Sequence, residues 1–311
     1  MKASKQFRHQ RRIVDGVLLL DKPQGMTSNA ALQTARRLLN AAKAGHTGTL
    51  DPMATGLLPL TFGEATKFSQ MLLDADKEYE ATVRLGIETD TGDAEGTQTV
   101  TAPVDVTEDA IRSALGRLTG EIEQVPPMYS ALKRDGRPLY EYARAGIEVE
   151  RAARKVTIHA LELLAVGPDS FRFRVACSKG TYVRTLAIDL GRILGCGGHL
   201  SALRRTRIGP FSIGLATTLD ALEAAAPEQR DRLLAPADAL VVHLPRVELD
   251  GAQAALLLQG RVLAVPAGNG GLARIYAEER FLGLGERTAD GKLCAKRLVS
   301  TNAPRVKVDN D

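Results

Sequence analysis

The sequence predicts an α+β (mixed α/β) protein with a second, smaller β domain at its C-terminal end. The chain has 311 residues, 44% hydrophobic and 25% charged, a balance typical of globular proteins with a sizeable core. That length favours two domains. Helical and extended hydrophobic patterns alternate over most of the chain, whereas the last 60 or so residues hold short extended segments between Gly-rich turns.

The first elements can be assigned from local pattern. Residues 16–21 (GVLLLD) form an apolar run closed by Lys-Pro, which predicts a buried strand. Thr27 or Ser28 is positioned to cap a helix, because apolar residues recur at helical spacing over 31–39. Four glycines and prolines over 45–56 predict a loop.

Later elements follow the same criteria. Alternation predicts strands over 80–87 and 156–176, and periodicity predicts helices over 107–118 and 182–194. Residues 125–155 are polar and rich in glycine and proline, which predicts a long mobile insertion. Pro245 and Asp250-Gly251 predict a linker within 241–251.

Composition excludes several classes of protein. No apolar run approaches the roughly 20 residues of a membrane-spanning helix. The three cysteines and five histidines are too scattered to predict a disulfide framework or a metal site, so we expect a reducing, cytoplasmic compartment. Residues 1–12 carry five basic residues and no acid, and we interpret them as a flexible basic arm.

The net charge of +4 conceals two segments of opposite sign. Residues 172–207 hold eight Lys and Arg against one acid, interleaved with aromatic residues, whereas residues 74–109 hold eleven acids against two bases. A basic patch of this kind suggests a polyanionic partner, most often nucleic acid. We expect the acidic segment either to lie away from that patch or to expose its few polar groups for a specific purpose.

Two superficial motif matches carry little weight. Ser130 and Lys133 have the Ser-x-x-Lys spacing of acyl-enzymes, but the companion motifs are missing. The glycine-rich stretch 45–56 lacks the Gly-Lys-Ser/Thr ending of a phosphate-binding loop, and Gly283-Leu-Gly285 is too short for a dinucleotide fingerprint. No cofactor and no metal are therefore expected.

The residues 45–56 (GHTGTLDPMATG) place one carboxylate, Asp51, in a constrained turn before Pro52. Local chemistry alone permits either a structural Asx turn or a functional carboxylate. A single carboxylate does not suit ordinary glycoside hydrolysis, which uses two. The residues by themselves leave the choice open.

A resemblance to a known family extends over this motif and four others. GHTGTLDPMATGLLPLTFGEATKF (45–68) resembles the signature of bacterial TruB-type tRNA pseudouridine-55 synthases. DKPQGMTS (21–28), KEYEATVRLGIETDTGDAEG (77–96), PPMYSALKRDGRPLYEYARAG (126–146) and CSKGTYVRTLAIDLG (177–191) resemble further family segments in the same order. Residues 281–285 (FLGLG) resemble part of the RNA-binding PUA domain that follows the catalytic domain in this family.

The resemblance implies a fold and an activity. It implies a catalytic domain over 13–247, with a central, largely antiparallel sheet flanked by helices, and a small PUA-like β-barrel over 250–311. The implied reaction converts the uridine at position 55, in the T loop of tRNA, to pseudouridine without a cofactor or a guide RNA. The base is flipped out of its stack, detached, rotated and rejoined through C5.

The resemblance also assigns the site residues. Asp51 matches the nucleophile, attacking either C1′ or C6; Tyr79 matches the tyrosine that stacks on the base and is a candidate for proton transfer. Arg184 matches the arginine that pairs with the nucleophile, and this pairing is expected to depress the pKa of Asp51. The remaining expected substrate-binding residues are His46, Asp90, Leu203, Lys22, Lys67, Tyr182, Arg204 and Arg205.

Of these expected substrate-binding residues, His46 would occupy the place in the base stack that the flipped uridine leaves. Asp90 would contact the flipped nucleotide, and Leu203 would pack on its base. The lysines would serve structure or phosphate binding, and Arg204 and Arg205 would contact phosphates.

The expected partner is tRNA, with the T arm on the catalytic domain and the acceptor stem on the PUA-like domain. The segment 125–155 would close over the RNA. We expect a monomer without an obligate protein partner or membrane attachment.

Three alternatives remain. The first is a non-catalytic RNA-binding protein or tRNA-folding chaperone, an activity that is also compatible with the enzyme. The second is a guide-RNA-dependent synthase with protein partners. Because the chain ends in its own PUA-like domain, we favour stand-alone action over this alternative. The third is an acyl-transfer enzyme using Ser130, which lacks its partner motifs.

Overall fold

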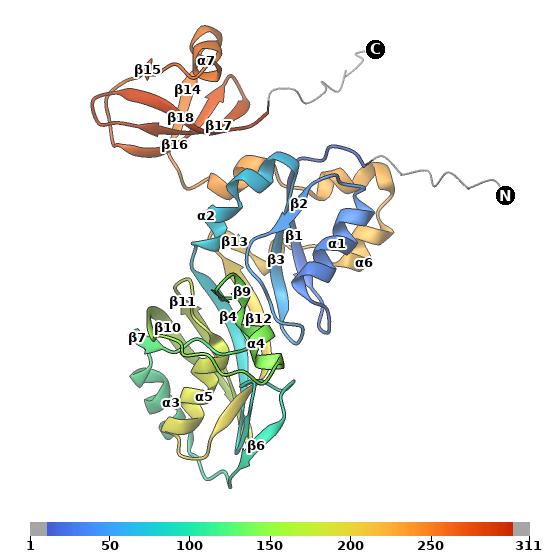
Figure 1. Cartoon of the computed structure of the whole chain (residues 1–311), viewed down its shortest axis with the longest axis vertical. Helices are drawn as coiled ribbons and strands as arrows, with labels where there is room; N and C mark the ends of the chain where they lie inside the picture. The colour runs from blue at the N-terminus through green and yellow to red at the C-terminus, as the bar shows by residue number, and fades with distance from the viewer. Residues whose placement is uncertain (1–10, 301–311) are drawn as a thin grey trace, which may run out of the picture.

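The computed structural model describes residues 11–300, which form a large part followed by a small C-terminal β domain (Figure 1). The large part is built on a nine-stranded sheet whose main path is β1-β3-β12-β4-β11-β10-β7, with β2 and β13 added beside β3 and β12. Its strands are β1 (Gly16–Lys22), β2 (Ala44–His46), β3 (Thr55–Phe62), β4 (Lys77–Leu85), β7 (Gly120–Gln124), β10 (Arg154–Val166), β11 (Ser170–Cys177), β12 (Gly198–Ile208) and β13 (Phe211–Ser212).

Neighbouring strands of this sheet run antiparallel except for β3 and β12, which are parallel. The predicted α+β fold with a largely antiparallel central sheet is confirmed. Two short strand pairs stand apart from this sheet: β5 (Ile87–Thr89) with β6 (Gln98–Thr101), and β8 (Lys133–Arg134) with β9 (Arg137–Pro138).

Three helices of the large part begin after a threonine that caps them. Thr27 and Thr107 accept hydrogen bonds from the backbone N–H groups of Ala30 and Ala110, as their positions before periodic segments predict. The α-helices are α1 (Ser28–Leu38), α2 (Ser69–Leu73), α3 (Glu108–Arg117), α4 (Leu139–Arg144), α5 (Val183–Ile193) and α6 (Leu219–Ala224), and the 3₁₀ helices are η1 (Gly63–Phe68), η2 (Ile213–Leu215), η3 (Pro227–Leu233) and η4 (Ala237–Val241).

Helix α5 covers the face of the sheet that forms the site. Leu186 and Leu190 of α5 are fully buried in the same core cluster as Ala81 and Val83 of β4. Because strand residues alternate between faces, Tyr79 lies on the same face as Ala81 and Val83. This packing places the first turn of α5, which includes Arg184, beside the loop between β2 and β3, which carries Asp51.

The segment 125–155 is not a bare loop. It contains the β8–β9 hairpin and α4, and its N-terminal portion reaches the first turn of α5. Its expected mobility remains a prediction.

The C-terminal domain is a curled five-stranded sheet in the order β14-β16-β17-β18-β15, accompanied by one helix (Figure 1). Its elements are β14 (Arg246–Leu249), α7 (Gly251–Leu258), β15 (Leu263–Ala264), β16 (Gly271–Ala277), β17 (Arg280–Arg287) and β18 (Lys292–Leu298). Leu257, Ile275 and Leu293 are fully buried in its own core, which supports the predicted small β domain.

The expected linker within 241–251 is wrong in part, because residues 246–249 form β14 and pair with β16. The proposed domain limits of 247 and 250 therefore fall inside or beside a strand of the second domain. Pro245 precedes this strand and Asp250-Gly251 follows it. These residues therefore mark the ends of a strand and do not indicate an unstructured connection. The expected PUA-like range also includes 301–311, which lie outside the described residues.

The two domains touch through η1. The Phe68 and Phe281 rings have centroids 5.3 Å apart, and Lys67 Nζ lies 2.9 Å from the Leu298 carbonyl oxygen. Lys67 also pairs with Glu64 at 2.7 Å, and Glu64 accepts the backbone N–H of Ser300.

The expected basic arm 1–12 lies outside the described residues except at its end. There Arg12 pairs with Asp231 and donates to the Leu39 carbonyl, so that residue belongs to the folded body. Within the described range 11–300, no helix is long and apolar enough to cross a membrane.

Candidate active site

A cavity of about 340 Å³ opens where five segments of the chain meet, one of them residues 130–132 after β7. The loop before β3 supplies Asp51, β4 supplies Tyr79, the start of α5 supplies Arg184 and β12 supplies Leu203. The cavity residues are Thr49, Leu50, Asp51, Tyr79, Ser130, Ala131, Leu132, Thr181, Tyr182, Val183, Arg184 and Leu203. The fold thus brings together residues from four separate motifs of the sequence.

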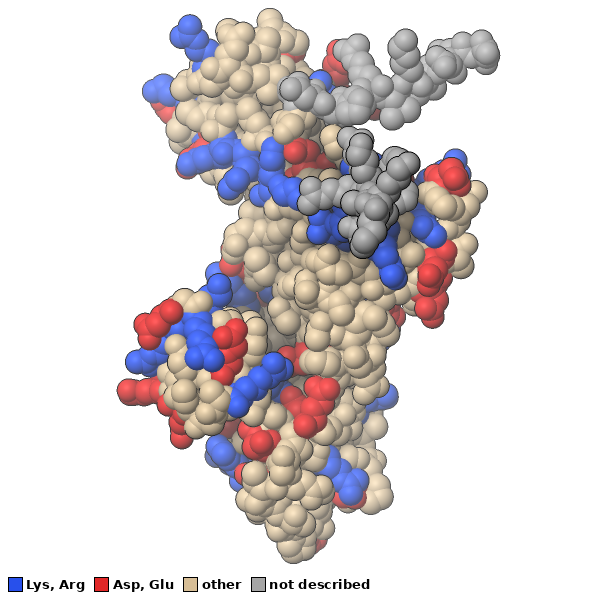
Figure 2. Space-filling view, turned by 45° about the vertical axis from the view of Figure 1, so that its right-hand side comes forward, with Lys and Arg blue, Asp and Glu red and all other residues tan. Residues whose placement is uncertain are grey.

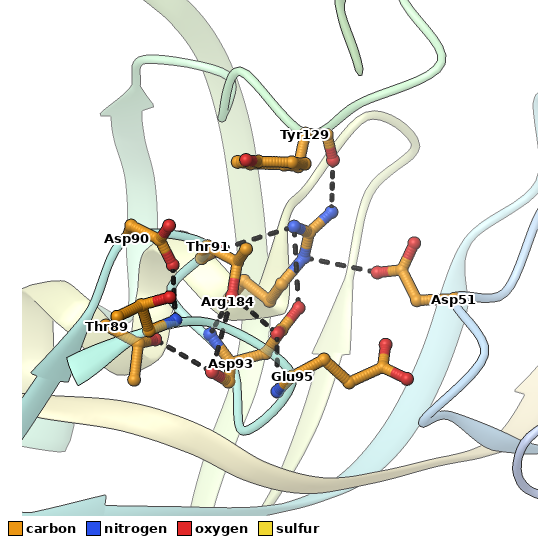
Figure 3. Close-up of polar contacts among 9 residues, drawn as sticks. Asp51, Thr89, Asp90, Thr91, Asp93, Glu95, Tyr129 and Arg184 are labelled. Carbon is orange, nitrogen blue, oxygen red and sulfur yellow. Dashed lines mark hydrogen bonds and ion pairs between the residues drawn. The ribbon is translucent and has the colours of Figure 1, made fainter. Parts of the chain in front are cut away.

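Arg184 connects two carboxylates at this cavity (Figure 3). Its Nε lies 3.1 Å from Asp51 Oδ2 and its Nη1 lies 3.6 Å from Asp93 Oδ2. The Arg184 and Asp93 side chains are only 6% and 5% exposed, whereas the Asp51 side chain is 38% exposed. The buried arginine therefore has one buried partner and one partner that faces the cavity.

Arg184 is further fixed by backbone acceptors. Nη2 donates to the Tyr129 carbonyl at 2.6 Å and Nη1 donates to the Thr91 carbonyl at 3.3 Å. These contacts hold the planar guanidinium in one orientation, with Nε directed at Asp51 (Figure 3).

Asp93 was not identified from the sequence. Its Oδ1 accepts hydrogen bonds from the Thr91 hydroxyl at 2.6 Å and from the Glu95 backbone N–H at 3.1 Å. Gly92 has φ +75°, and a Cβ there would lie 2.6 Å from Ile188 Cδ1 on α5, so glycine allows this turn to approach α5 closely. Gly92 beside an acid, within a segment that resembles the family, is the signal that could have found Asp93.

The expected contact of Asp90 with the flipped nucleotide stays a prediction, and the structure places its side chain on the surface. Its Oδ1 accepts the Thr97 backbone N–H at 2.7 Å, and Asp90 is not among the cavity residues. The acid of this segment that reaches the cavity arginine is Asp93.

The pKa of Asp51 is raised above its ordinary value, chiefly by burial of the carboxyl group. Arg184 lowers this pKa as expected, but Asp93 raises it, and the net effect is a rise. The predicted depression is therefore wrong, because desolvation and a second carboxylate outweigh the arginine.

Tyr79 and Leu203 both line the cavity. Tyr79 is buried, and burial raises its pKa, so the phenol remains protonated at neutral pH. Leu203 is half-buried on β12, in register with Ala81 on β4. A flat ring and a branched aliphatic side chain are suited to enclose the two faces of a planar heterocycle.

Two expected substrate-binding residues are fully enclosed. Lys22 is 0% exposed, and its Nζ donates to the carbonyls of Pro23, Met26 and Pro52, which ties the turn after β1 to the turn that carries Asp51. Burial lowers the pKa of Lys22 to about 8. Its position supports the structural role that was one of its two expected roles, and not phosphate contact.

Arg205 is likewise 1% exposed, with Nε donating to the Leu57 carbonyl at 2.7 Å and Nη2 to the Gly48 carbonyl at 3.3 Å. The expectation of a phosphate contact does not fit this position. On β12, residue 205 faces the same side of the sheet as Tyr79, which places it beneath the cavity and not on the surface.

The other expected residues have varied surroundings. Arg204 makes two hydrogen bonds to Asp21, at 2.7 and 3.0 Å, with 42% of its side chain exposed. Lys67 lies at the joint with the C-terminal domain. His46 on β2 is half-buried with Nδ1 lacking a partner within the described structure, and Tyr182, the residue before α5, lines the cavity.

The basic segment 172–207 does not form an isolated patch. Several of its bases pair with acids of segment 74–109: Lys179 with Asp74, Arg184 with Asp93 and Arg192 with Glu88. The expectation that the two segments lie apart, the first of the two alternatives, is wrong, because β4 of the acidic segment is hydrogen-bonded to both β11 and β12. Figure 2 shows Lys and Arg side chains instead gathered on the side of the C-terminal domain that faces the large part.

No group of three or more His, Cys, Asp or Glu is arranged to hold a metal ion among residues 11–300.

Comparison with known proteins identifies the family of this chain. Residues 36–183 match the TruB family pseudouridylate synthase N-terminal domain, 184–242 match the tRNA pseudouridylate synthase B C-terminal domain, and 245–299 match the pseudouridine synthase II TruB C-terminal domain. The "tRNA pseudouridine synthase B" of Aromatoleum aromaticum is 80% identical over 303 residues, which cover 97% of this chain and 98% of the relative. The chain belongs to the TruB family.

A second relative of the TruB family, from an Azoarcus species, is 66% identical over 94% of this chain and 97% of its own length. Among solved structures, a chain of a "Cbf5-Nop10-Gar1 complex" aligns with TM-score 0.68 and 33% identity, over 89% of this chain and 79% of that one. A chain of an "H/ACA RNP bound to a substrate RNA containing 2'-deoxyuridine" aligns with TM-score 0.70 and 29% identity, over 92% and 85%. The resemblance read from the sequence is confirmed.

Proposed function

We propose that the protein isomerises uridine to pseudouridine in tRNA, at position 55 of the T loop, without cofactor or guide RNA. The observation that carries the proposal is the pairing of Arg184 with Asp51 at the mouth of a cavity walled by Tyr79 and Leu203. Family membership and relatives of up to 80% identity that bear the name tRNA pseudouridine synthase B support the reaction and the substrate class. The activity belongs in the cytoplasm, where tRNA is modified.

In this reaction Asp51 is the nucleophile, attacking C1′ of the ribose or C6 of the base. Attack requires the carboxylate form, and Arg184 both supplies positive charge and limits the rotation of Asp51. Asp93 is a positioning residue for Arg184, because it is buried and does not line the cavity. Tyr79 stacks on the base and remains a candidate for proton transfer.

One carboxylate suffices for this chemistry because no water has to be activated. The uracil that leaves C1′ is held by the cavity and rejoins the same carbon through C5, so substrate and product have the same composition. The cost of flipping the nucleotide, a few kcal/mol, is met by contacts inside the cavity.

We further propose that the acceptor stem rests on the C-terminal domain and that the segment 125–155 closes over the T arm. Two features support these assignments. Basic side chains gather where the C-terminal domain faces the large part, and Tyr129 of the segment already contacts Arg184 (Figure 2). We assign the protein monomeric, stand-alone action.

The test is tritium release from unmodified tRNA labelled at uridine C5, with wild type beside Asp51→Asn and with RNA binding measured separately. We expect release by wild type only, and binding by both. A tRNA with cytidine at position 55 should abolish release if that position is the target. Binding by both proteins with release by neither would favour an RNA chaperone over the enzyme.

A further inference from the structure

Helix α5 carries Arg184 in its first turn, and its N-cap residue makes no capping hydrogen bond. That residue is Tyr182, whereas α1, α3 and α6 each begin after a threonine whose side chain caps the helix. The first turn of a helix leaves backbone N–H groups without intrahelical partners, so an uncapped end frays readily. The orientation of Arg184, the second residue of α5, therefore depends on contacts from outside the helix.

Gln124, the last residue of β7, supplies such a contact from 58 residues away in the chain. Its Oε1 accepts the Tyr182 backbone N–H at 3.0 Å, and its Nε2 donates to the Tyr182 carbonyl at 3.4 Å. The N–H can only donate, so it determines which end of the Gln124 amide faces it. Because Gln124 is only 2% exposed, water cannot readily replace these contacts if they are lost.

The contact reproduces one half of a capping box between two distant elements. In α7, Gln253 Oε1 accepts the N–H of the N-cap residue Asp250 at 3.1 Å. Gln124 does the same for the N-cap residue of α5, but from β7, which pairs with β10 of the central sheet. The start of α5 is thereby tied to the sheet that also carries Tyr79.

The segment that follows Gln124 holds the side chain of Arg184. The Tyr129 carbonyl accepts from Arg184 Nη2 at 2.6 Å (Figure 3). Residues 124–129 therefore contact both the backbone just before Arg184 and its guanidinium group. Apolar packing at Leu186 and Leu190 secures the following turns of the helix, so it leaves the first turn to these polar contacts.

We propose that Gln124 is a positioning residue, which holds the start of α5 so that Arg184 directs Nε at Asp51. This inference rests on the proposed function. Gln124 is neutral and does not line the cavity, and within residues 11–300 its side-chain hydrogen bonds go to the Tyr182 backbone. Any effect of Gln124 on the reaction must therefore pass through the position of α5.

The experiment compares Gln124→Met with wild type in the full-length protein. Methionine keeps an unbranched side chain of similar length and removes both amide contacts. Bound-state rates, RNA affinities and rate–pH profiles are measured on a T-arm hairpin that carries uridine at the target. Gln124→Glu, which keeps an oxygen acceptor for the Tyr182 N–H, tests whether the rate can be rescued.

Thr107→Ala is the matched control, because it removes a helix cap elsewhere in the same part of the molecule. The Thr107 hydroxyl oxygen accepts the Ala110 backbone N–H at 3.3 Å at the start of α3. Its loss should lower stability, as loss of the Gln124 contacts should, but α3 supplies no residue to the cavity.

We expect Gln124→Met to slow the bound-state rate by roughly tenfold, since small displacements of a positioning group are costly, and to leave RNA affinity unchanged. Its acid limb should move to higher pH, because Arg184 lowers the pKa of Asp51 and a displaced guanidinium lowers it less. Asp93 and Lys22, which also act on that pKa, are present in both proteins, and the substitution changes no charge. Gln124→Glu should recover most of the lost rate, and Thr107→Ala should match wild type.

Hydrogen exchange at the Tyr182 amide tests the contact independently of activity. The amide should exchange faster in Gln124→Met than in wild type or Thr107→Ala, because it loses its acceptor. Equal exchange in the three proteins would overturn the proposal.

Three kinetic results would also overturn it. A Gln124→Met protein with the wild-type rate and acid limb would remove the role. An equal loss of rate in Thr107→Ala would reduce it to general stability. A Gln124→Glu protein as slow as Gln124→Met would show that the acceptor for the Tyr182 N–H is not what matters. Failure of wild type itself on uridine would instead refute the proposed function, and the exchange measurement would still decide whether Gln124 holds the helix.

Discussion

Arg184 is shared between two carboxylates that differ in burial, and this difference sets the properties of the site. Asp93 is enclosed and held by Thr91 and the Glu95 backbone, so it anchors the guanidinium. Asp51 is the partner with access to the cavity. The arrangement keeps the arginine in place while leaving one carboxylate free to react.

Changing Asp93 to Asn is expected to alter the pH dependence of the reaction. Asp93 raises the pKa of Asp51, so its neutralisation should lower that pKa and shift the acid limb of the single-turnover rate to lower pH. The rate at neutral pH should fall roughly 10- to 100-fold, because Arg184 loses its anchor. Rate–pH profiles of Asp93→Asn beside Asp90→Asn test this; a larger loss at Asp90 would favour the assignment made from the sequence.

Changing Asp51 to Asn is expected to stabilise the protein. The pKa of Asp51 is higher in the folded state than the ordinary aspartate value of 3.8, so the ionised carboxylate disfavours folding at pH values above 3.8. Thermal unfolding at pH 7 should show a higher midpoint for the variant, and the advantage should shrink near pH 4, where protonation relieves the wild type. A lower midpoint at pH 7 would mean that the Arg184 pairing outweighs the burial.

For single residues, the sequence identified Asp51, Tyr79, Arg184 and Leu203 as site residues. All four line one cavity, and their roles remain proposals. The sequence was uninformative about burial. Only the neighbouring Gly92 sets Asp93 apart from the other ten acids of segment 74–109, and the burial of Asp93 depends on a turn closed by Thr89 and Thr91. For the same reason Arg205 was mistaken for a surface residue.

Among the elements, the parallel contact between β3 and β12 depends on a glycine. Gly56 has φ +99°, and a Cβ there would lie 2.3 Å from the Arg205 carbonyl oxygen. The two strands register at Thr55–Arg204 and Gly56–Arg205, immediately beside the loop of Asp51. Close approach of the two backbones at this point therefore determines where Asp51 is placed.

Gly56→Ala is expected to destabilise the protein by at least about 2 kcal/mol, because both the positive φ and the backbone contact oppose a side chain. Gly116→Ala, in α3 with open space around it, should instead gain about 0.5–1 kcal/mol from higher helix propensity. Urea unfolding of the two variants measures both values. Equal stabilities would refute the importance of this contact.

Element types were predicted more accurately than their connections. The caps at Thr27 and Thr107 and the strand at 16–21 follow from local chemistry, and the structure contains them. The expected linker failed at residues 246–249 because β14 alternates over only four residues, between turn-forming residues, and its identity depends on pairing with β16. Likewise, pairing of β4 with β11 and β12 brought oppositely charged segments together, which no local pattern reveals.

On the scale of the whole molecule, η1 joins the two domains through an aromatic contact and hydrogen bonds of Lys67 and Glu64 to the end of the second domain. Phe281 packs on Phe68 and on Tyr276, whose hydroxyl bonds to Asp238 of the large part. Lys67 and Glu64 add polar contacts to the end of β18. The joint therefore combines a buried apolar contact with polar contacts around it, as a stable interface does.

Phe281→Ala is expected to loosen this joint without altering the cavity. Turnover of an isolated T-arm hairpin should stay at the wild-type level, whereas KM for full-length tRNA should rise roughly tenfold, because only the long substrate would engage both domains. Leu272→Ala, an exposed leucine of the same domain, is the control. A loss of hairpin turnover in Phe281→Ala would show that the C-terminal domain supports the chemistry itself.

The joint at Lys67 and Phe281 has one more consequence. Two RNA-contacting regions held at a fixed separation would select a ligand by its length, because a ligand that reaches both must have its two contact points at the same spacing. For the proposed substrate, that spacing is the length of helical RNA between the T loop and the end of the acceptor stem. Selection by length asks nothing of the base sequence in between, so a single enzyme would bind the many tRNAs of a cell more tightly than hairpins too short to reach both regions.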